Sequence, residues 1–416
     1  MSDAGVTWAG THTFGAARLV MARSIEEAAE VLRSADGPVR ALGTRHSFHD
    51  LADTEGTLVS LVDVPADPVL DEAAHTVTVG AGTRYGVLAL WLEERGWALA
   101  NMGSLPHISI AGATQTGTHG SGVGNGNLSS SVEALEFLDA VGTTVTVQRG
   151  DMDFHALAVG LGAFGVVTRV TLDIQPTYQV QQSVLAGITW EDFLADSDHL
   201  LAAAYSVSVF TKWGEPTLEQ VWVKAREGRD PAIASGWMGG TLLDGPTRLV
   251  DGDPADLTEQ GTPGAWLHRL PHFRLDGTPS NGDEIQTEYF VAREDAADAL
   301  RAVRELAPAI DPLLMITELR TVAADGLWLS GAYGRDTLAI HFTWRNLPGP
   351  VAAVLPKIEA ALAPFAPRPH WGKWHAFDSE RIAAAFPRLA DAREVFERLD
   401  PHGRFVNKHL TRLGVR

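Results

Sequence analysis

The chain has no cysteine among its 416 residues, and this absence removes several kinds of chemistry at once. It excludes disulfide bonds, thiolate zinc sites, thiol nucleophiles and a thioether link to a cofactor. Histidine, of which the chain has 15, must therefore supply any soft ligand or nucleophile that the protein uses.

Basic residues are also scarce. The 33 Lys and Arg residues are outnumbered by 52 Asp and Glu, and the formal net charge is -19. No block of Lys or Arg forms a basic patch, which argues against nucleic acid and anionic membranes as partners. No apolar run approaches the roughly 18 residues of a membrane span, and the first residues, MSDAGVTWAG, lack the pattern of a signal peptide. We expect a cytoplasmic protein, and a monomer.

A third shortage is local, because the 37 residues between Arg95 and Glu133 include no Asp, Glu, Lys or Arg. At the overall charged fraction of 20%, such a stretch would carry about seven charges. Its centre, residues 103–122, reads GSLPHISIAGATQTGTHGSG and combines glycines with neutral hydroxyls. Converging N–H groups without carboxylates suit a diphosphate. We interpret the run as backbone that wraps a large polar ligand, and a stretch of buried turn and core is the plain structural alternative.

Helical and strand patterns alternate up to about residue 174 and then change character. A helix N-capped by Ser24 is predicted within residues 23–36, and a hairpin turn at Gly142 and Thr143. Residues 179 to about 370 are richer in Trp, Pro and loops, with several strand patterns and a helix predicted over 294–310. Because one core rarely grows to this chain length, we expect two domains of an α+β fold.

The segment GLGAFG at residues 160–165 matches the dinucleotide fingerprint G-x-G-x-x-G. It follows a predicted helix and opens into a predicted strand, which is the reverse of the order in a Rossmann turn. We predict no nicotinamide site there.

Three segments together resemble a known family: ALGTRHSFHD (41–50), the charge-free stretch 103–122, and DPHGRFVN near the C-terminus. They are similar to flavoenzymes of the vanillyl-alcohol oxidase type. HWGKWH (370–375) resembles the aldonolactone oxidase branch, and its pairing with ELR at Glu318 resembles the bacterial alditol oxidases, which oxidise sugar alcohols. The resemblance implies an FAD-binding domain of two small α/β subdomains at residues 1–178 and a substrate domain with a mixed or antiparallel sheet at 179–371. Residues 372–416 would return to the interface.

The same resemblance implies FAD as the cofactor and His46 as its covalent anchor. Attachment requires a neutral imidazole nitrogen that acts as a nucleophile. His49 raises the alternative of an HxxH metal pair, but no third ligand follows at plausible spacing, so we predict no metal site. The predicted cofactor contacts are His46, Ala41, Leu42, Gly43, Thr44, Arg45, Ser47, Gly103, Ser104, Ser109, Gly112, Thr116, Gly117, Thr118, His119 and Val166.

Two strand patterns predict the substrate site. In LLMITELRTV a period of two places Glu318 and Arg320 on one face, and in TLAIHFTWRN it places His341 and Thr343 together. If the strands are neighbours, these side chains form one polar patch, and a carboxylate beside a guanidinium suits a chain of hydroxyl groups. A surface salt bridge on an exposed sheet is the plain structural alternative. Similarity to alditol oxidases adds Ser104 and Lys373 as substrate contacts.

We expect Lys373, between Trp371 and Trp374 in the sequence, to act with Arg320 and Glu318 in catalysis, because positive charge near the substrate oxygen lowers its pKa. In related flavoenzymes the residue at the position of Gly103 controls access of oxygen, so glycine implies an oxidase that produces hydrogen peroxide from O2. The expected substrate is a small polyol such as xylitol, sorbitol or glycerol. An aldonolactone oxidoreductase is the alternative, and a non-catalytic carbohydrate-binding protein with stacking tryptophans is a third reading.

Overall fold

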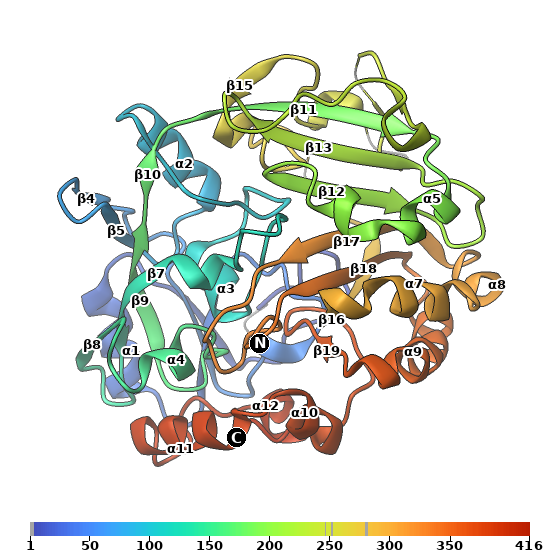
Figure 1. Cartoon of the computed structure of the whole chain (residues 1–416). Coiled ribbons are helices and arrows are strands. Elements are labelled where there is room, and N and C mark those ends of the chain that lie inside the picture. Colours follow the sequence, from blue (N-terminus) through green and yellow to red (C-terminus); the bar gives the residue numbers. More distant parts are fainter. Residues whose placement is uncertain (1–3, 246, 251–252, 279–281) are drawn as a thin grey trace.

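The computed structural model describes residues 4–245, 247–250, 253–278 and 282–416. Figure 1 shows a large sheet formed by the middle of the chain, with the N-terminal third on one side of it and the C-terminal helices below. Helices and antiparallel sheets are both abundant, which confirms the predicted α+β class. Within the described ranges, no helix has the length and apolar character needed to cross a membrane.

The first sheet is small and parallel, with strand order β1-β3-β2. Its strands are β1 (Arg18–Met21), β2 (Val39–Leu42) and β3 (Thr57–Ser60), and α1 (Ile25–Ser34) connects the first two. The predicted cap of α1 is confirmed, since the Ser24 hydroxyl accepts a hydrogen bond from the Glu27 backbone N–H at 3.1 Å. The loop that leaves β2 carries His46.

The second sheet is antiparallel, with order β4-β5-β9-β7-β8. The predicted hairpin joins β7 and β8, and Gly142 adopts a positive φ of 76° in its loop. Residues 160–165 lie between α4 and β9, so the segment follows a helix and opens into a strand as predicted. The elements of this region are β4 (Val69–Asp71), β5 (Thr76–Gly80), α2 (Tyr85–Glu93), β6 (Trp97–Ala98), α3 (Ile110–Gln115), β7 (Val132–Leu138), β8 (Thr144–Gln148), α4 (Phe154–Leu157), β9 (Val166–Asp173) and β10 (Gln175–Pro176).

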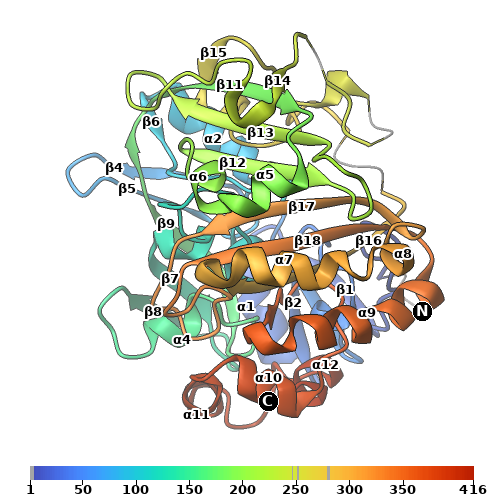
Figure 2. The ribbon, with the colours of Figure 1, turned by 45° about the vertical axis from the view of Figure 1, so that its right-hand side comes forward.

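The large antiparallel sheet has the order β14-β11-β13-β12-β17-β18-β16-β19, with β15 pairing with β11. Its strands are β11 (Gln179–Ala186), β12 (Ser206–Thr211), β13 (Gln220–Arg226), β14 (Thr241–Leu242), β15 (Pro263–Ala265), β16 (Glu284–Ala292), β17 (Leu314–Val322), β18 (Thr337–Arg345) and β19 (Arg368–Pro369). Helices α5 (Trp190–Ala195), α7 (Ala296–Arg304) and α9 (Pro348–Leu362) lie along one face of this sheet (Figure 2). The other face is turned toward the N-terminal part.

One helix prediction is wrong in detail. The pattern over residues 294–310 predicts a single helix, but the structure divides it into η6 (Arg293–Asp295), α7 and α8 (Ala307–Ile310). Pro308 explains the break between α7 and α8, because its ring has no N–H and would clash with the carbonyl of Arg304 in a continuous helix.

The C-terminal segment packs against the N-terminal part (Figure 1). Asn407 Nδ2 donates to the carbonyl oxygens of Leu51 and Asp53 at 2.9 and 2.8 Å, so the end of the chain holds the stretch that follows the His46 loop. The remaining helices are α6 (Ser197–Leu201), α10 (Ser379–Ala385), α11 (Leu389–Leu399), α12 (Lys408–Arg412) and the short η1 (Asp50–Ala52), η2 (Leu128–Ser131), η3 (Trp237–Gly239), η4 (Pro254–Asp256), η5 (Trp266–His268) and η7 (Ala363–Phe365).

Candidate active site

A cavity of about 540 Å³ lies between the N-terminal part and the large sheet. Its wall combines the two loops singled out in the sequence with the sheet face that carries the predicted polar patch. The wall residues fall mainly within 40–52, 104–119, 161–167, 249–250, 253–257, 272–273, 284–288, 316–320, 341–343 and 370–373.

The two glycine-containing loops meet at one edge of the cavity. Ser109 donates its backbone N–H to Thr44 Oγ1 at 3.1 Å, which joins the loop after β2 to the start of α3. A Cβ at Gly43 or at Gly112 would lie only 2.7 Å from Ser109 Oγ. Glycine therefore permits the close approach of these loops.

His46 is half-buried on the cavity wall, and its ring centre lies 5.2 Å from that of Trp8. The preceding residue, Arg45, has a φ of 66°, so the backbone turns sharply just before the histidine. Burial, assisted by the positive charges of His107 and Arg84, lowers the pKa of His46 to about 4. The imidazole is consequently neutral near pH 7, as a nucleophilic nitrogen must be.

Most predicted cofactor contacts lie on the cavity wall: Ala41, Leu42, Gly43, Thr44, Arg45, His46, Ser47, Ser104, Ser109, Gly112, Thr116, Thr118 and His119. Within the described part of the chain, Gly103, Gly117 and Val166 are not wall residues. Val166 is fully buried in the core, while its strand neighbour Val167 lines the cavity, because successive side chains of a strand point to opposite faces. A Cβ at Gly117 would face Val159 at 3.6 Å.

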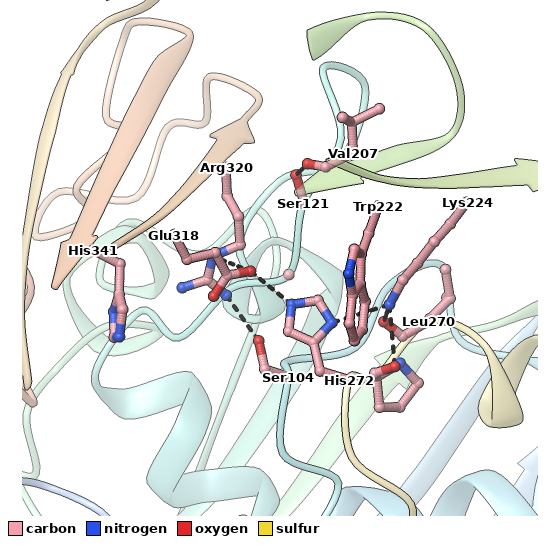
Figure 3. A network of polar contacts seen from close by, with 12 residues as sticks. Ser104, Ser121, Val207, Trp222, Lys224, Leu270, His272, Glu318, Arg320 and His341 are labelled. Atoms are coloured by element: carbon pink, nitrogen blue, oxygen red, sulfur yellow. Dashed lines mark hydrogen bonds and ion pairs between the residues drawn. The ribbon is translucent and has the colours of Figure 1, made fainter. Parts of the chain in front are cut away.

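The predicted polar patch on the large sheet is present. Strands β17 and β18 are antiparallel neighbours, and Glu318 lies directly opposite His341 in their register. Arg320 Nη1 donates to Ser104 Oγ at 3.2 Å, which links the sheet to the charge-free loop (Figure 3). All of the predicted substrate contacts, Ser104, Glu318, Arg320, His341, Thr343 and Lys373, line the cavity.

Glu288 on β16 is a central member of this patch that the sequence interpretation missed. Its side chain is fully buried, and it lies 2.8 Å from Arg320 Nη2, 3.1 Å from His119 Nε2 and 3.2 Å from Lys373 Nζ. Burial alone would raise the pKa of Glu288, but the charges of Lys373 and Arg320 hold it well below its usual range. A signal was available, since Glu284, Gln286 and Glu288 repeat with a strand period of two.

Lys373 is held by acidic and imidazole partners rather than by the flanking tryptophans. Its Nζ donates to His341 Nδ1 at 2.8 Å and lies against Glu288. Trp371 instead stacks on Phe386 at 4.5 Å, and Trp374 donates to a backbone carbonyl. Burial lowers the pKa of Lys373, and the charge of Glu288 opposes this effect.

The ionisation of the remaining groups follows from their neighbours. Burial alone would raise the pKa of Glu318, but the charge of Arg320 and the hydrogen bond from His272 lower it. Burial also lowers the pKa of His341 to about 4, so its ring is neutral beside the Lys373 cation. The cavity wall thus presents ionised carboxylates and cations next to neutral histidines.

His49, discounted as a metal ligand for want of a third group, does have Asp50 and His409 beside it in the structure. Sequence spacing could not reveal His409, which comes from the other end of the chain. The His49 and His409 rings stack at 4.4 Å with an interplanar angle of 25°, so their lone pairs do not converge on one point. Arg412 donates to both carboxylate oxygens of Asp50, which makes the cluster a poor cation site.

Comparison with known proteins assigns the family. Residues 16–148 match the model of an FAD binding domain, and residues 282–413 match the model of D-arabinono-1,4-lactone oxidase. An alditol oxidase from Streptomyces sp. is 42% identical over 414 residues, with 99% of each chain covered. The chain belongs to the alditol oxidase family. As a member of this family it is an FAD-dependent oxidoreductase of the aldonolactone oxidase branch.

More distant relatives of the alditol oxidase family extend the comparison. L-gulono-1,4-lactone dehydrogenase from Mycobacterium tuberculosis is 29% identical, with 99% of each chain covered. Among solved structures, cholesterol oxidase from B. sterolicum has a TM-score of 0.81 at 15% identity, with 99% of this chain and 96% of that chain covered. This likeness supports the predicted two-domain fold of the vanillyl-alcohol oxidase type.

The cavity has features that fit FAD. Ser109 Oγ is buried and has no hydrogen-bond partner among the described residues, so it is available to a ligand atom. Gly43 and Gly112 leave the space around this hydroxyl open, and carboxylates are absent from the described segments 40–49 and 104–119 of the wall. These are the properties that a diphosphate requires.

Proposed function

We propose that the protein oxidises the terminal CH2OH group of an alditol, of the xylitol, sorbitol or glycerol type, to the aldehyde, and that O2 takes up the electrons as hydrogen peroxide. The observation that supports this most strongly is the patch of Glu318, Arg320 and Lys373 on the wall of the same cavity as His46, with Glu318 and Arg320 buried and Lys373 half-buried. FAD, when bound, supplies the acceptor for the hydride that leaves the carbon.

The roles of the protein groups follow from their charges. Arg320 and Lys373 place two cations beside the oxygen of the reacting alcohol, where they stabilise negative charge as its proton is lost. Glu318 and Thr343 offer acceptors to further hydroxyl groups of the polyol, and Ser104 adds another from the opposite loop. Because Glu318, Arg320 and Thr343 are buried, their hydrogen bonds to the substrate are little weakened by water.

We further propose that FAD is attached covalently to His46 and that Ala41 to Ser47, Ser109, Gly112, Thr116 and Thr118 hold it. The neutral imidazole and its position on the cavity wall support the attachment. His119 also faces the cavity, but its ring bonds to Glu288 and to the Gly120 carbonyl, so we assign it to the support of the substrate patch.

An aldonolactone is the alternative substrate, because some of the relatives act on lactones. Glu318 favours the alditol. An aldonolactone has fewer hydroxyl donors than the alditol of the same chain length, because its two ester oxygens can only accept hydrogen bonds, and a buried carboxylate needs donors. The pKa of Glu318 is lowered, so the group is ionised and cannot itself donate.

The domain limits, the location and the oligomeric state are also proposals. We place an FAD-binding domain at residues 1–178, a substrate domain at 179–371 and a returning segment at 372–416. The large sheet, whose strands run from β11 to β19, supports the middle limits. The absence of cysteine from the sequence and the net charge of -19 suit a cytoplasmic monomer. Size-exclusion chromatography with light scattering tests the monomer.

One experiment tests the function. The visible spectrum of the purified protein is recorded before and after acid denaturation, and the native protein is then offered xylitol, sorbitol, glycerol and L-gulono-1,4-lactone with detection of peroxide. The expected result is a flavin spectrum, colour that stays with the denatured protein, and peroxide from the alditols. Oxidation of the lactone alone would overturn the alditol proposal, and a colourless protein would overturn the cofactor.

A further inference from the structure

A buried lysine on the large sheet lies behind the patch of Glu318, Arg320 and Lys373, and it is not among the described residues that line the cavity. Lys224 on β13 is 1% exposed. Its Nζ donates to the carbonyl oxygens of Leu270 and Pro271 at 2.6 and 3.1 Å, and to His272 Nδ1 at 3.1 Å (Figure 3). These three acceptors match the three N–H groups of an ammonium.

Lys224 fixes the tautomer of His272. A lysine ammonium can only donate, so Nδ1 of His272 must accept, and in the neutral ring the proton is then on Nε2. That N–H points at Glu318 Oε1, 2.6 Å away. The ring is 5% exposed and lies edge-on against Phe210 and Trp222, so it has little freedom to turn.

The neutral state of His272 has a physical cause. Burial lowers the pKa of His272 to about 4, and the charge of Lys224 adds to this effect against the attraction of Glu318. Burial lowers the pKa of Lys224 as well, to about 7. At neutral pH the ring of His272 therefore links Lys224 and Glu318 through two directed hydrogen bonds, without adding a charge of its own.

The backbone of the same segment holds the opposite wall of the cavity. The N–H groups of His272 and Phe273 both donate to the carbonyl oxygen of Ser104, at 3.1 and 3.2 Å. The side chain of Ser104 in turn accepts from Arg320. Lys224, by binding three consecutive residues, thus shapes a segment that reaches Ser104 and Glu318 at once.

We propose that His272 and Lys224 are positioning residues for the oxidation. Lys224 holds His272 as the Nε2–H tautomer, and His272 aims the carboxylate of Glu318 at the substrate hydroxyls while its segment fixes Ser104. This inference rests on the proposed function, since it assigns Glu318 and Ser104 to substrate binding. A purely structural bridge would instead leave kinetics unchanged in any variant that folds and binds FAD.

The test compares His272→Phe, His272→Gln and the exposed control His268→Phe as FAD-loaded enzymes, with flavin content measured for each. Phenylalanine fills the space but makes neither hydrogen bond. We expect kcat/KM of His272→Phe for the best alditol to fall about tenfold or more. Most of this fall should come from a higher KM, because Glu318 loses its fixed direction while its charge remains. The amide of glutamine can both donate and accept, so His272→Gln should recover to within about threefold of the wild type.

A further variant, Lys224→Met, removes the hydrogen bond to His272 from the lysine side. It provides the test if His272→Phe fails to fold. It keeps an unbranched side chain of similar length and removes the three donors. We expect KM to rise as in His272→Phe, with flavin retained.

Two results overturn the inference: wild-type KM and kcat in a folded His272→Phe or Lys224→Met, or equal losses in His272→Gln and His272→Phe. A wild-type enzyme that oxidises none of the alditols overturns the proposed function instead, so the two failures are distinguished.

Discussion

Glu288 forms ion pairs with two cations through one carboxylate: its Oε2 lies 3.2 Å from Lys373 Nζ and its Oε1 lies 2.8 Å from Arg320 Nη2. The carboxylate is fully buried, so the attraction is little screened by solvent. Without it, two positive charges would face each other at the cavity wall. Glu288 therefore permits the local concentration of positive charge that the proposed oxidation uses.

Replacement of Glu288 by Gln should destabilise the protein. The amide keeps the shape but removes the counter-charge of Lys373 and one of the two carboxylates beside Arg320, which retains Glu318 at 3.4 Å. Removal of one partner of a buried pair costs about 3 to 5 kcal/mol. Urea unfolding of the FAD-loaded enzyme measures the change. The exposed Glu294→Gln variant is the control and should stay within about 0.5 kcal/mol. Equal stability of the two variants would show that Glu288 is not needed to balance these charges.

Loss of the substrate patch should remove turnover and leave the cofactor in place. We expect Glu318→Gln, Arg320→Ala and Lys373→Ala each to lower kcat/KM by about a hundredfold or more, since each removes a charge that faces the reacting substrate in the proposed function. Steady-state kinetics and flavin absorbance give the two readouts. Arg345→Ala, an exposed position on β18, is the matched control. Loss of FAD from the three variants would make these residues structural.

Covalent attachment makes a prediction about a single histidine. The wild-type protein should keep its yellow colour after acid precipitation, and His46→Ala should release FAD into the supernatant, because no imidazole nitrogen then bonds to the flavin. His199→Ala, on the surface of α6, should behave as the wild type. The absorbance of the pellet and of the supernatant shows where the flavin is. Colour that stays with the His46→Ala pellet would mean that FAD is attached to another residue.

Gly103 tests the route of oxygen. A Cβ there would lie 3.5 Å from Ile108 Cδ1 and 3.6 Å from Thr118 Cγ2, which are ordinary contacts, so Gly103→Ala should fold normally. If the glycine leaves oxygen its path, the added methyl group should slow reoxidation of the reduced enzyme by about tenfold or more, equal to about 1.4 kcal/mol in the barrier. Stopped-flow mixing with O2 measures this rate. An unchanged rate, with alditol reduction intact, would exclude this route.

A histidine cluster at the C-terminal segment should make stability sensitive to acid. Burial lowers the pKa of His49, His375 and His409, and that of His375 falls to about 3. Their folded-state pKa values lie below the unfolded value of about 6.5, so the stability they contribute is present above pH 6.5 and is lost as the pH falls toward 3.

Each of these histidines steepens the loss by up to about 1.4 kcal/mol per pH unit. Denaturant unfolding of the protein between pH 7 and pH 5 gives the slope. His375→Gln should reduce the slope by about one proton, whereas His402→Gln, at an exposed position, should leave it unchanged. The same slope in both variants would contradict the assignment.

The glycine-containing loops and the polar face of Glu318 and Arg320 on the cavity wall were predictable because their signals are local. Ser, Thr and Gly around His46 and in residues 103–122 mark backbone that can approach a ligand, and the chain shows this without any long-range contact. Strand period likewise predicts that Glu318 and Arg320 share a face. The predicted patch also required β17 and β18 to be neighbours. The structure meets this requirement, because Glu318 lies opposite His341 in the register of the two strands.

No local sequence pattern could predict which residues are the partners of these groups. Glu288 follows a strand period, but only the order β17-β18-β16 brings it to Arg320 and Lys373. His272 lies in a segment without periodicity, and only the fold places it between Lys224 and Glu318.

The sequence by itself determined which residue types could serve: no thiols, few cations, a charge-free loop, and two strands with a polar face. The tertiary structure alone decided which of them face one cavity and in what state of charge. The physical reason is that a pKa and a hydrogen bond depend on burial and on neighbours within a few ångströms, and those neighbours come from strands and loops far apart in the chain.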